Sequence, residues 1–173
     1  MRRLMLLRHA KSLMAEPGQR DRDRGLSQRG HRDAVAMGHA LSSRLARPDL
    51  VLCSAARRTR ETLAAILPQL ESDIVVRITD VLYDHTAPTY CDTIAEMAGV
   101  AQSVLVIGHN PTIHATAIRL AGHGPEALRA RLAGKFPTCA LAAIEIGETE
   151  WTGMADGCGT LDDFIVPPDL QTG

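Results

Sequence analysis

The sequence predicts an α/β protein, built as a three-layer sandwich in which a mostly parallel central sheet carries helices on both faces. Apolar segments of strand length alternate along the chain with segments of helical periodicity, and this alternation is typical of a parallel sheet covered by helices. The 173 residues, 45% of them apolar, suffice for a sizeable core. We find no linker or internal repeat and therefore expect one domain over residues 1–173.

Short apolar segments mark the expected strands. Four of them should form the parallel part of the sheet, at residues 3–8, 49–53, 74–78 and 103–107. Two later segments, 140–146 and 160–166, are expected to close the sheet and could pair as a hairpin.

The segments between the strands predict helices. Ser27 can cap a helix whose small and apolar positions, spaced by four, three and four residues from Ala34 to Leu45, form one stripe ending before Pro48. Further helices are expected at about 56–67, 88–98 and 111–121. Asn110 is a good N-cap for the last of these, and Pro111 suits its first helical position. Residues 123–138 are expected to form a loop with a short helical piece.

Composition excludes several functional classes. The formal net charge is −1 and aromatic residues make up only 3%, so neither nucleic acid nor a membrane surface is an expected partner. No apolar stretch reaches membrane-spanning length, and a cytoplasmic location is the default expectation. The cysteines lie far apart and histidines form no metal-binding motif, so we expect packing roles for the cysteines and no metal or other cofactor. These cysteines are Cys53, Cys91, Cys139 and Cys158.

Polar residues of one chemical kind follow three of the predicted strands. Arg8 and His9 end the first strand, Ser54 ends the second with Arg58 four residues later, and His109 follows the fourth. In open α/β sheets, ligands bind at the carboxyl ends of the strands. Arginine forks and helix N-termini favour phosphate. The sequence therefore predicts a site for a phosphoryl group at this edge.

Four segments resemble the motifs of the histidine phosphatase superfamily, in the family's order. LLRHAKS resembles its Arg-His signature, and CSAARRTRET resembles the motif in which Ser54, Arg58 and Thr62 are spaced by four residues. VIGHNP resembles the motif of the second histidine, and DRDRGLSQRG resembles the Asp-x-x-Arg-x-Leu-Ser/Thr-x-x-Gly stretch. The short chain and the alanine after His9 are most similar to the SixA-type phosphohistidine phosphatases. The resemblance implies a phosphoglycerate mutase-like fold.

The resemblance also implies phosphoryl transfer to a histidine, followed by hydrolysis. His9 would be the nucleophile, and Arg8, Arg58 and His109 would bind and stabilise the phosphoryl group. Ser54 and Asn110 are further candidates at the phosphate site, where either could hold a neighbouring group or simply cap a helix. In related enzymes the proton donor often follows the third strand, so Asp84 is the candidate acid here and His85 the second.

Three functions fit these residues. The first is a phosphatase acting on phosphohistidine in a protein, approached across the charged segment from Lys11 to Arg24. The second is a phosphatase for a small phosphomonoester with the same chemistry; a mutase is less expected, because few residues remain for a closing lid. The third is a phosphate-binding module without turnover, against which the presence of both His9 and His109 argues.

Overall fold

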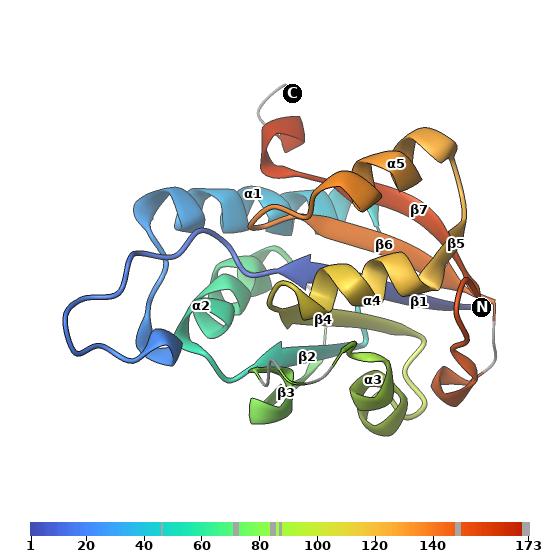
Figure 1. Cartoon of the computed structure of the whole chain (residues 1–173), viewed down its shortest axis with the longest axis horizontal. Coiled ribbons are helices and arrows are strands. Elements are labelled where there is room, and N and C mark those ends of the chain that lie inside the picture. The colour runs from blue at the N-terminus through green and yellow to red at the C-terminus, as the bar shows by residue number, and fades with distance from the viewer. Residues whose placement is uncertain (46, 71–72, 84–85, 87, 148–149, 171–173) are drawn as a thin grey trace.

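The computed structural model describes residues 1–173 except 46, 71–72, 84–85, 87, 148–149 and 171–173. Its strands form a seven-stranded sheet in the order β3-β2-β4-β1-β6-β7-β5 (Figure 1). Neighbouring strands from β3 to β1 run parallel, β6 is antiparallel to both β1 and β7, and β5 pairs parallel with β7. The strands are β1 Arg2–Arg8, β2 Leu50–Ser54, β3 Val75–Thr79, β4 Ser103–Gly108, β5 Ala121–His123, β6 Leu141–Ile146 and β7 Gly159–Ile165.

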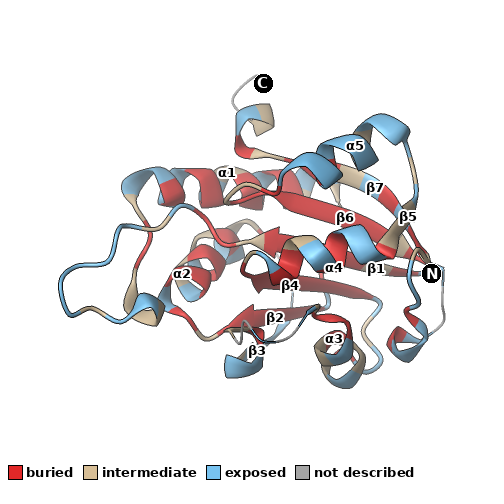
Figure 2. Ribbon diagram, viewed as in Figure 1, coloured by how far each residue is buried: buried red, intermediate tan, exposed pale blue. Residues whose placement is uncertain are grey.

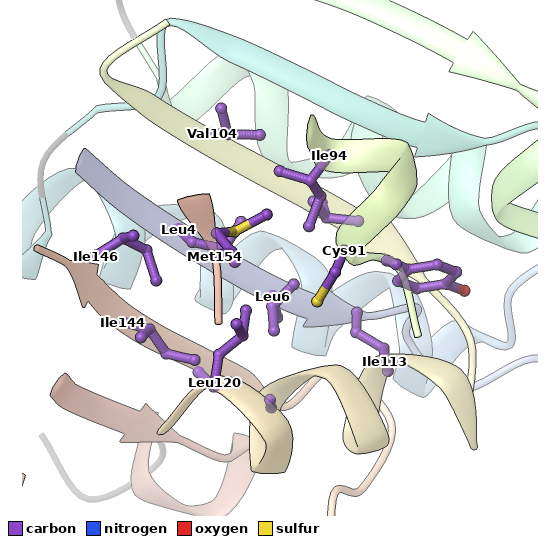
Figure 3. Packing of buried hydrophobic residues seen from close by; sticks show 14 of the residues in the cluster. Leu4, Leu6, Cys91, Ile94, Val104, Ile113, Leu120, Ile144, Ile146 and Met154 are labelled. Carbon is purple, nitrogen blue, oxygen red and sulfur yellow. The ribbon is translucent and has the colours of Figure 1, made fainter. Parts of the chain in front are cut away.

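Helices cover both faces of this sheet, as the sequence predicts. They are α1 Gln28–Arg44, α2 Arg57–Ile66, α3 Cys91–Met97, α4 Thr112–Leu120 and α5 Glu126–Gly134. Alternate side chains of β1 point to opposite faces. Leu4 and Leu6 pack in a cluster with side chains from α3, α4 and α5 (Figure 3), whereas Met5 and Leu7 pack with side chains from α1 and α2. The result is the expected three-layer α/β fold.

Burial follows this layering, with one exception at the sheet edge. Most residues of β1, β4 and β6 are buried (Figure 2). In contrast, Val75, Val76 and Ile78 of the edge strand β3 are 58%, 37% and 51% exposed. The sheet has the expected helical cover, and the edge strand β3 is its least buried part.

The sequence analysis misplaced the start of α4 and underestimated the region after it. Asn110 does not cap α4, because the helix begins at Thr112 and its N-cap position is Pro111. The side-chain amide of Asn110 instead donates to the carbonyl of Phe136, 2.9 Å away. The region expected to be mostly loop contains the nine-residue helix α5, and the short strand β5 precedes it.

The register of the parallel strands brings their carboxyl ends together. Arg8, at the end of β1, pairs with Gly108, at the end of β4. On the other side of β4, Cys53 of β2 pairs with Ile107. The residues that follow these three strand ends are therefore neighbours in space, although they lie far apart in the sequence.

The segment after β1 is held against the start of α1. Ser27 caps α1 by accepting a hydrogen bond from the Gly30 N–H, 3.0 Å away. Both the N–H and the hydroxyl of Ser27 donate to the Lys11 carbonyl. Gly30 lies so close to this carbonyl that a β-carbon at position 30 would stand 2.1 Å from the Lys11 oxygen. Only glycine therefore allows this approach without a shift of the chain just after His9.

We predict that Gly30→Ala destabilises the protein, because the added methyl group must displace the Lys11 carbonyl. Overpacking of this kind costs about 1–3 kcal/mol, measured as the free energy of unfolding in urea. Gly134→Ala is the matched control, because a β-carbon at position 134 in α5 meets nothing within 4 Å. Equal stability of the two variants would contradict the prediction.

Candidate active site

Side chains that end or follow the strands β1, β2 and β4 line one cavity of about 540 Å³ at the carboxyl edge of the sheet. Of the residues predicted from sequence, Arg8, His9, Arg58, His109 and Asn110 line it. Arg8 closes β1 and His9 follows it, whereas Arg58 is the second residue of α2. The fold therefore gathers these side chains in the place where the sequence predicts a phosphoryl site.

His9 is held in a single orientation with one ring nitrogen facing the cavity. Its Nδ1–H donates to the carbonyl of Ala10, 2.8 Å away, which leaves the lone pair on Nε2. The Nε–H of Arg58 donates to this Nε2 over 3.3 Å. Burial, helped by the charges of Arg58 and Arg8, lowers the pKa of His9 to about 3. The ring is thus neutral at neutral pH, with Nε2 available as a nucleophile.

The backbone next to His9 is hydrogen-bonded to α2. The backbone N–H of Ala10 donates to the hydroxyl of Thr62, 3.0 Å away, and this hydroxyl donates to the carbonyl of Arg58. Thr62 therefore ties the chain after His9 to the turn of α2 that carries Arg58. The spacing of Arg58 and Thr62 by four residues places both on one face of the helix.

Two guanidinium groups flank the imidazole. The Nη1–H of Arg8 donates to the carbonyl of Phe136, 3.0 Å away, and its buried Nε has no hydrogen-bond partner among the described residues. Burial and the nearby charge of Arg58 both lower the pKa of Arg8. Like charges confined in a partly dry site repel each other, and a bound dianion would relieve this repulsion.

His109 faces His9 and is held from behind by Ser54. The centroids of the two histidine rings are 5.2 Å apart, and a 2.8 Å hydrogen bond joins His109 Nε2 to Ser54 Oγ. The backbone N–H of His109 donates to the hydroxyl of Tyr90. Ser54 is completely buried and is not among the residues that line the cavity, so it has the other expected role, that of holding a neighbouring group. It contacts His109 instead of the cavity.

The two candidates for the proton donor, Asp84 and His85, lie outside the described residues. Their neighbour Tyr83 closes the short 3₁₀ helix η3 (Asp80–Tyr83) and lines the cavity. Its ring packs edge-on against His109, with centroids 5.5 Å apart.

The sequence analysis missed several residues of the cavity wall, among them Asp21, Arg24 and Tyr83. Asp21 belongs to the short 3₁₀ helix η1 (Asp21–Asp23) in the long loop between β1 and α1 (Figure 1). A signal for two of them was present, since Asp21 and Arg24 are the first and fourth positions of the Asp-x-x-Arg stretch. That pattern indicated a family likeness but not the contacts that these side chains make.

Neither a metal-binding cluster nor a membrane-spanning helix is present among the described residues. No three His, Cys, Asp or Glu side chains gather there in a way that could hold a metal ion. No helix in the same part of the chain is long and apolar enough to cross a membrane.

Comparisons with known proteins agree with this geometry. Residues 4–86 match the model of the histidine phosphatase superfamily (branch 1). A Mycobacterium tuberculosis protein is 37% identical over 163 residues, covering 93% of this chain and 99% of that protein. The solved structure of the proposed phosphohistidine phosphatase SixA from Agrobacterium tumefaciens is 36% identical, with a TM-score of 0.80 over 95% of this chain and 97% of that one.

A second solved structure, the proposed phosphohistidine phosphatase SixA from Nakamurella multipartita, is 33% identical. Its TM-score is 0.80, and the match covers 96% of both chains. The chain therefore belongs to the histidine phosphatase superfamily, in which it is a phosphatase of the SixA type.

Proposed function

We propose that this phosphatase removes the phosphoryl group from phosphohistidine on a protein, through a covalent intermediate on His9. In the first step, the Nε2 lone pair of His9 forms a bond to phosphorus and the N–P bond of the substrate breaks. The electron pair of that bond stays on the leaving imidazole, which takes up a proton. In the second step, water attacks phosphorus, the Nε2–P bond breaks, and inorganic phosphate leaves.

One observation carries this proposal: a neutral imidazole nitrogen faces an anion-binding cavity between two arginines. Nδ1 of His9 is occupied by the Ala10 carbonyl, so only Nε2 can attack. Arg8 and Arg58 line the same cavity and would neutralise the charge on the non-bridging oxygens. His109, if protonated in the complex, would add a further donor. This positive charge is of the kind that a metal ion supplies elsewhere, so we propose that none is needed.

A protein substrate is supported by the surroundings of the cavity. The solved structures that are 36% and 33% identical are both described as proposed phosphohistidine phosphatases. Beside the cavity, Leu13 and Met14 are 55% and 86% exposed, and Met14 lines its rim. Exposed apolar side chains next to a catalytic pocket favour contact with a protein surface.

A cytoplasmic location and Asp84 as acid complete the proposal. The thiols of Cys53, Cys91 and Cys139 are buried outside any disulfide, as is usual in a reducing compartment. A phosphoester needs a stronger acid than phosphohistidine does, because the N–P bond is already labile. Asp84, with His85 as the second candidate, would matter mainly for esters.

We predict that the His9 ring stays neutral far below neutral pH. Its pKa in the folded protein is about 3, against ~6.5 for a histidine in an unfolded chain. The unfolded chain therefore binds a proton first as the pH falls, and the stability that neutral His9 contributes is lost between those two values. Nitrogen-15 NMR of the free enzyme should show an unchanged His9 ring, protonated at Nδ1, from pH 8 to about 5. Titration of this ring near pH 6.5 would contradict the prediction.

We predict that His9→Ala abolishes turnover without unfolding the protein, because the substitution removes the Nε2 atom that attacks phosphorus in the proposed mechanism. Rapid quenching of the wild-type enzyme with a ³²P-labelled substrate should trap a phosphoenzyme that acid destroys and alkali spares. A fully active His9→Ala protein would rule out the intermediate.

We predict that turnover is equal with and without EDTA, because the arginines supply the positive charge in the proposed mechanism. Activity that EDTA removes and a metal ion restores would rule out metal independence.

We predict that Arg58 and Arg57 differ sharply although they are adjacent. Arg58 donates to His9 Nε2, and loss of an arginine that stabilises a transferring phosphoryl group costs about 10³-fold or more in rate. Arg57 is half exposed and pairs with Glu61 at 2.6 Å. Arg58→Ala should lower kcat and raise KM, whereas Arg57→Ala should change kcat/KM little. The reverse order would show that the second motif was aligned incorrectly.

The substrate class is tested by competition. We expect a phosphorylated histidine phosphotransfer domain or phosphocarrier protein to have a higher kcat/KM than any member of a panel of sugar and nucleotide phosphates. If a small ester exceeds every phosphohistidine protein, the substrate proposal fails in favour of the small-molecule alternative. The covalent mechanism at His9 would be unaffected by that result.

A further inference from the structure

Asp21 holds the guanidinium group of Arg58 from the side away from His9. The backbone carbonyl of Asp21 accepts a hydrogen bond from Arg58 Nη1 at 2.8 Å, and its carboxylate Oδ2 accepts one from Nη2 at 3.0 Å. Arg58 is 5% exposed. Both terminal nitrogens are thus bound by one residue, which lies 37 positions earlier in the chain.

The third nitrogen of the same guanidinium points at the nucleophile. Arg58 Nε donates to His9 Nε2 at 3.3 Å. A guanidinium is planar and its five N–H groups have fixed directions. Two contacts from Asp21 therefore fix the direction of the Nε–H as well. A phosphoryl group bound to His9 Nε2 would meet this edge of Arg58 without any rotation of the side chain.

Asp21 is itself held by other side chains of the cavity wall. Arg24 Nη1 donates to its Oδ1 at 2.9 Å, and the hydroxyl of Tyr83 donates to its Oδ2 at 2.9 Å. Burial favours a raised pKa for this carboxyl, but the hydrogen bonds of Tyr83 and Arg58 and the charges of Arg58 and Arg24 outweigh it and lower the pKa. Both carboxylate oxygens accept from cavity-wall donors, and an ionised Asp21 has no proton to give a leaving group.

We propose that Asp21 is a positioning residue of the phosphatase reaction, which clamps Arg58 through both Nη atoms so that its Nε edge faces the phosphoryl group on His9. This inference rests on the proposed function of His9 and Arg58. It assigns a role to the first position of the Asp-x-x-Arg stretch. Asp21 acts through Arg58 and takes no part in proton transfer.

A double-mutant cycle tests the clamp, with an aryl phosphate as substrate. Asp21→Ala should lower kcat/KM by about 10- to 100-fold, since misplacing a catalytic group by 1 Å can cost 10²-fold. Arg58→Lys keeps a charge but has no planar fork to be clamped. In that background, Asp21→Ala should change kcat/KM by less than about threefold, because interacting residues are not additive. Asp21→Asn, which keeps an acceptor oxygen, should recover part of the loss.

Asp23→Ala is the matched control, because Asp23 lies in the same 3₁₀ helix and its carboxylate pairs at 2.7 Å with the exposed Arg20. It should behave as wild type. The kcat/KM of Asp21→Ala should depend on pH in the same way as that of the wild type and should be lower by the same factor at every pH. If Asp21→Ala lowers kcat/KM equally in both backgrounds, the clamp is wrong and the role of Asp21 is structural. If the substitution removes one limb of the pH–rate profile, the clamp is wrong and Asp21 has an acid–base role.

The failure of this inference is distinguishable from that of the proposed function. If the wild-type protein turns over neither aryl phosphate nor phosphohistidine, the proposed function fails. The same cycle is then measured as the Kd for orthovanadate by calorimetry, where Asp21→Ala should weaken binding only when Arg58 is present. If the wild type is active and Asp21→Ala matches Asp23→Ala, the clamp alone is wrong.

Discussion

The pairing of β1 with β4 is the constraint on which the rest of the site depends. It sets Arg8 level with Gly108, so the next residues, His9 and His109, leave the sheet side by side. A shift of one residue in this register would turn the alternating side chains of β1 to the opposite faces. Leu4 and Leu6 would then leave the cluster that they share with α3, α4 and α5. The same apolar packing that stabilises the sheet therefore also fixes the distance between the two histidines.

The positive charge of Arg8 and Arg58 lies next to the ring of His9 and affects its protonation. The site holds two buried or half-buried guanidinium groups next to an imidazole that burial keeps neutral. A protonated His9 would add a third positive charge and would lose its nucleophilic lone pair. In the proposed mechanism the arginines bind the phosphoryl group, and their charge adds to burial in keeping His9 in the neutral form that can attack it. The same two positive charges thus favour both a bound anion and a neutral His9.

The features that local patterns encode were predictable from sequence. Apolar segments gave the strands β1, β2 and β4 to within about one residue, and Arg8, His9, Arg58 and His109 follow from residue types at their ends. The strand β5 could not be predicted, because its three residues depend on pairing with β7. Its Gly122 lies so close to Gly157 that a β-carbon would stand 2.3 Å from the Gly157 carbonyl oxygen. The contacts of Ser54 with His109 and of Asn110 with Phe136 could not be predicted, because these partners lie far away in the sequence.

Asp21 illustrates the same limit within the site itself. The Asp-x-x-Arg pattern sets Asp21 apart from Asp23, two residues later in the same 3₁₀ helix, but it does not show that Asp21 contacts Arg58 and that Asp23 contacts an exposed arginine. The difference also bears on why position 58 holds arginine. A lysine could neutralise a phosphoryl group with its single ammonium, but it could not donate to Asp21 in two fixed directions and to His9 in a third. Only a planar group with several donors can be clamped on one side and still present a directed N–H on the other.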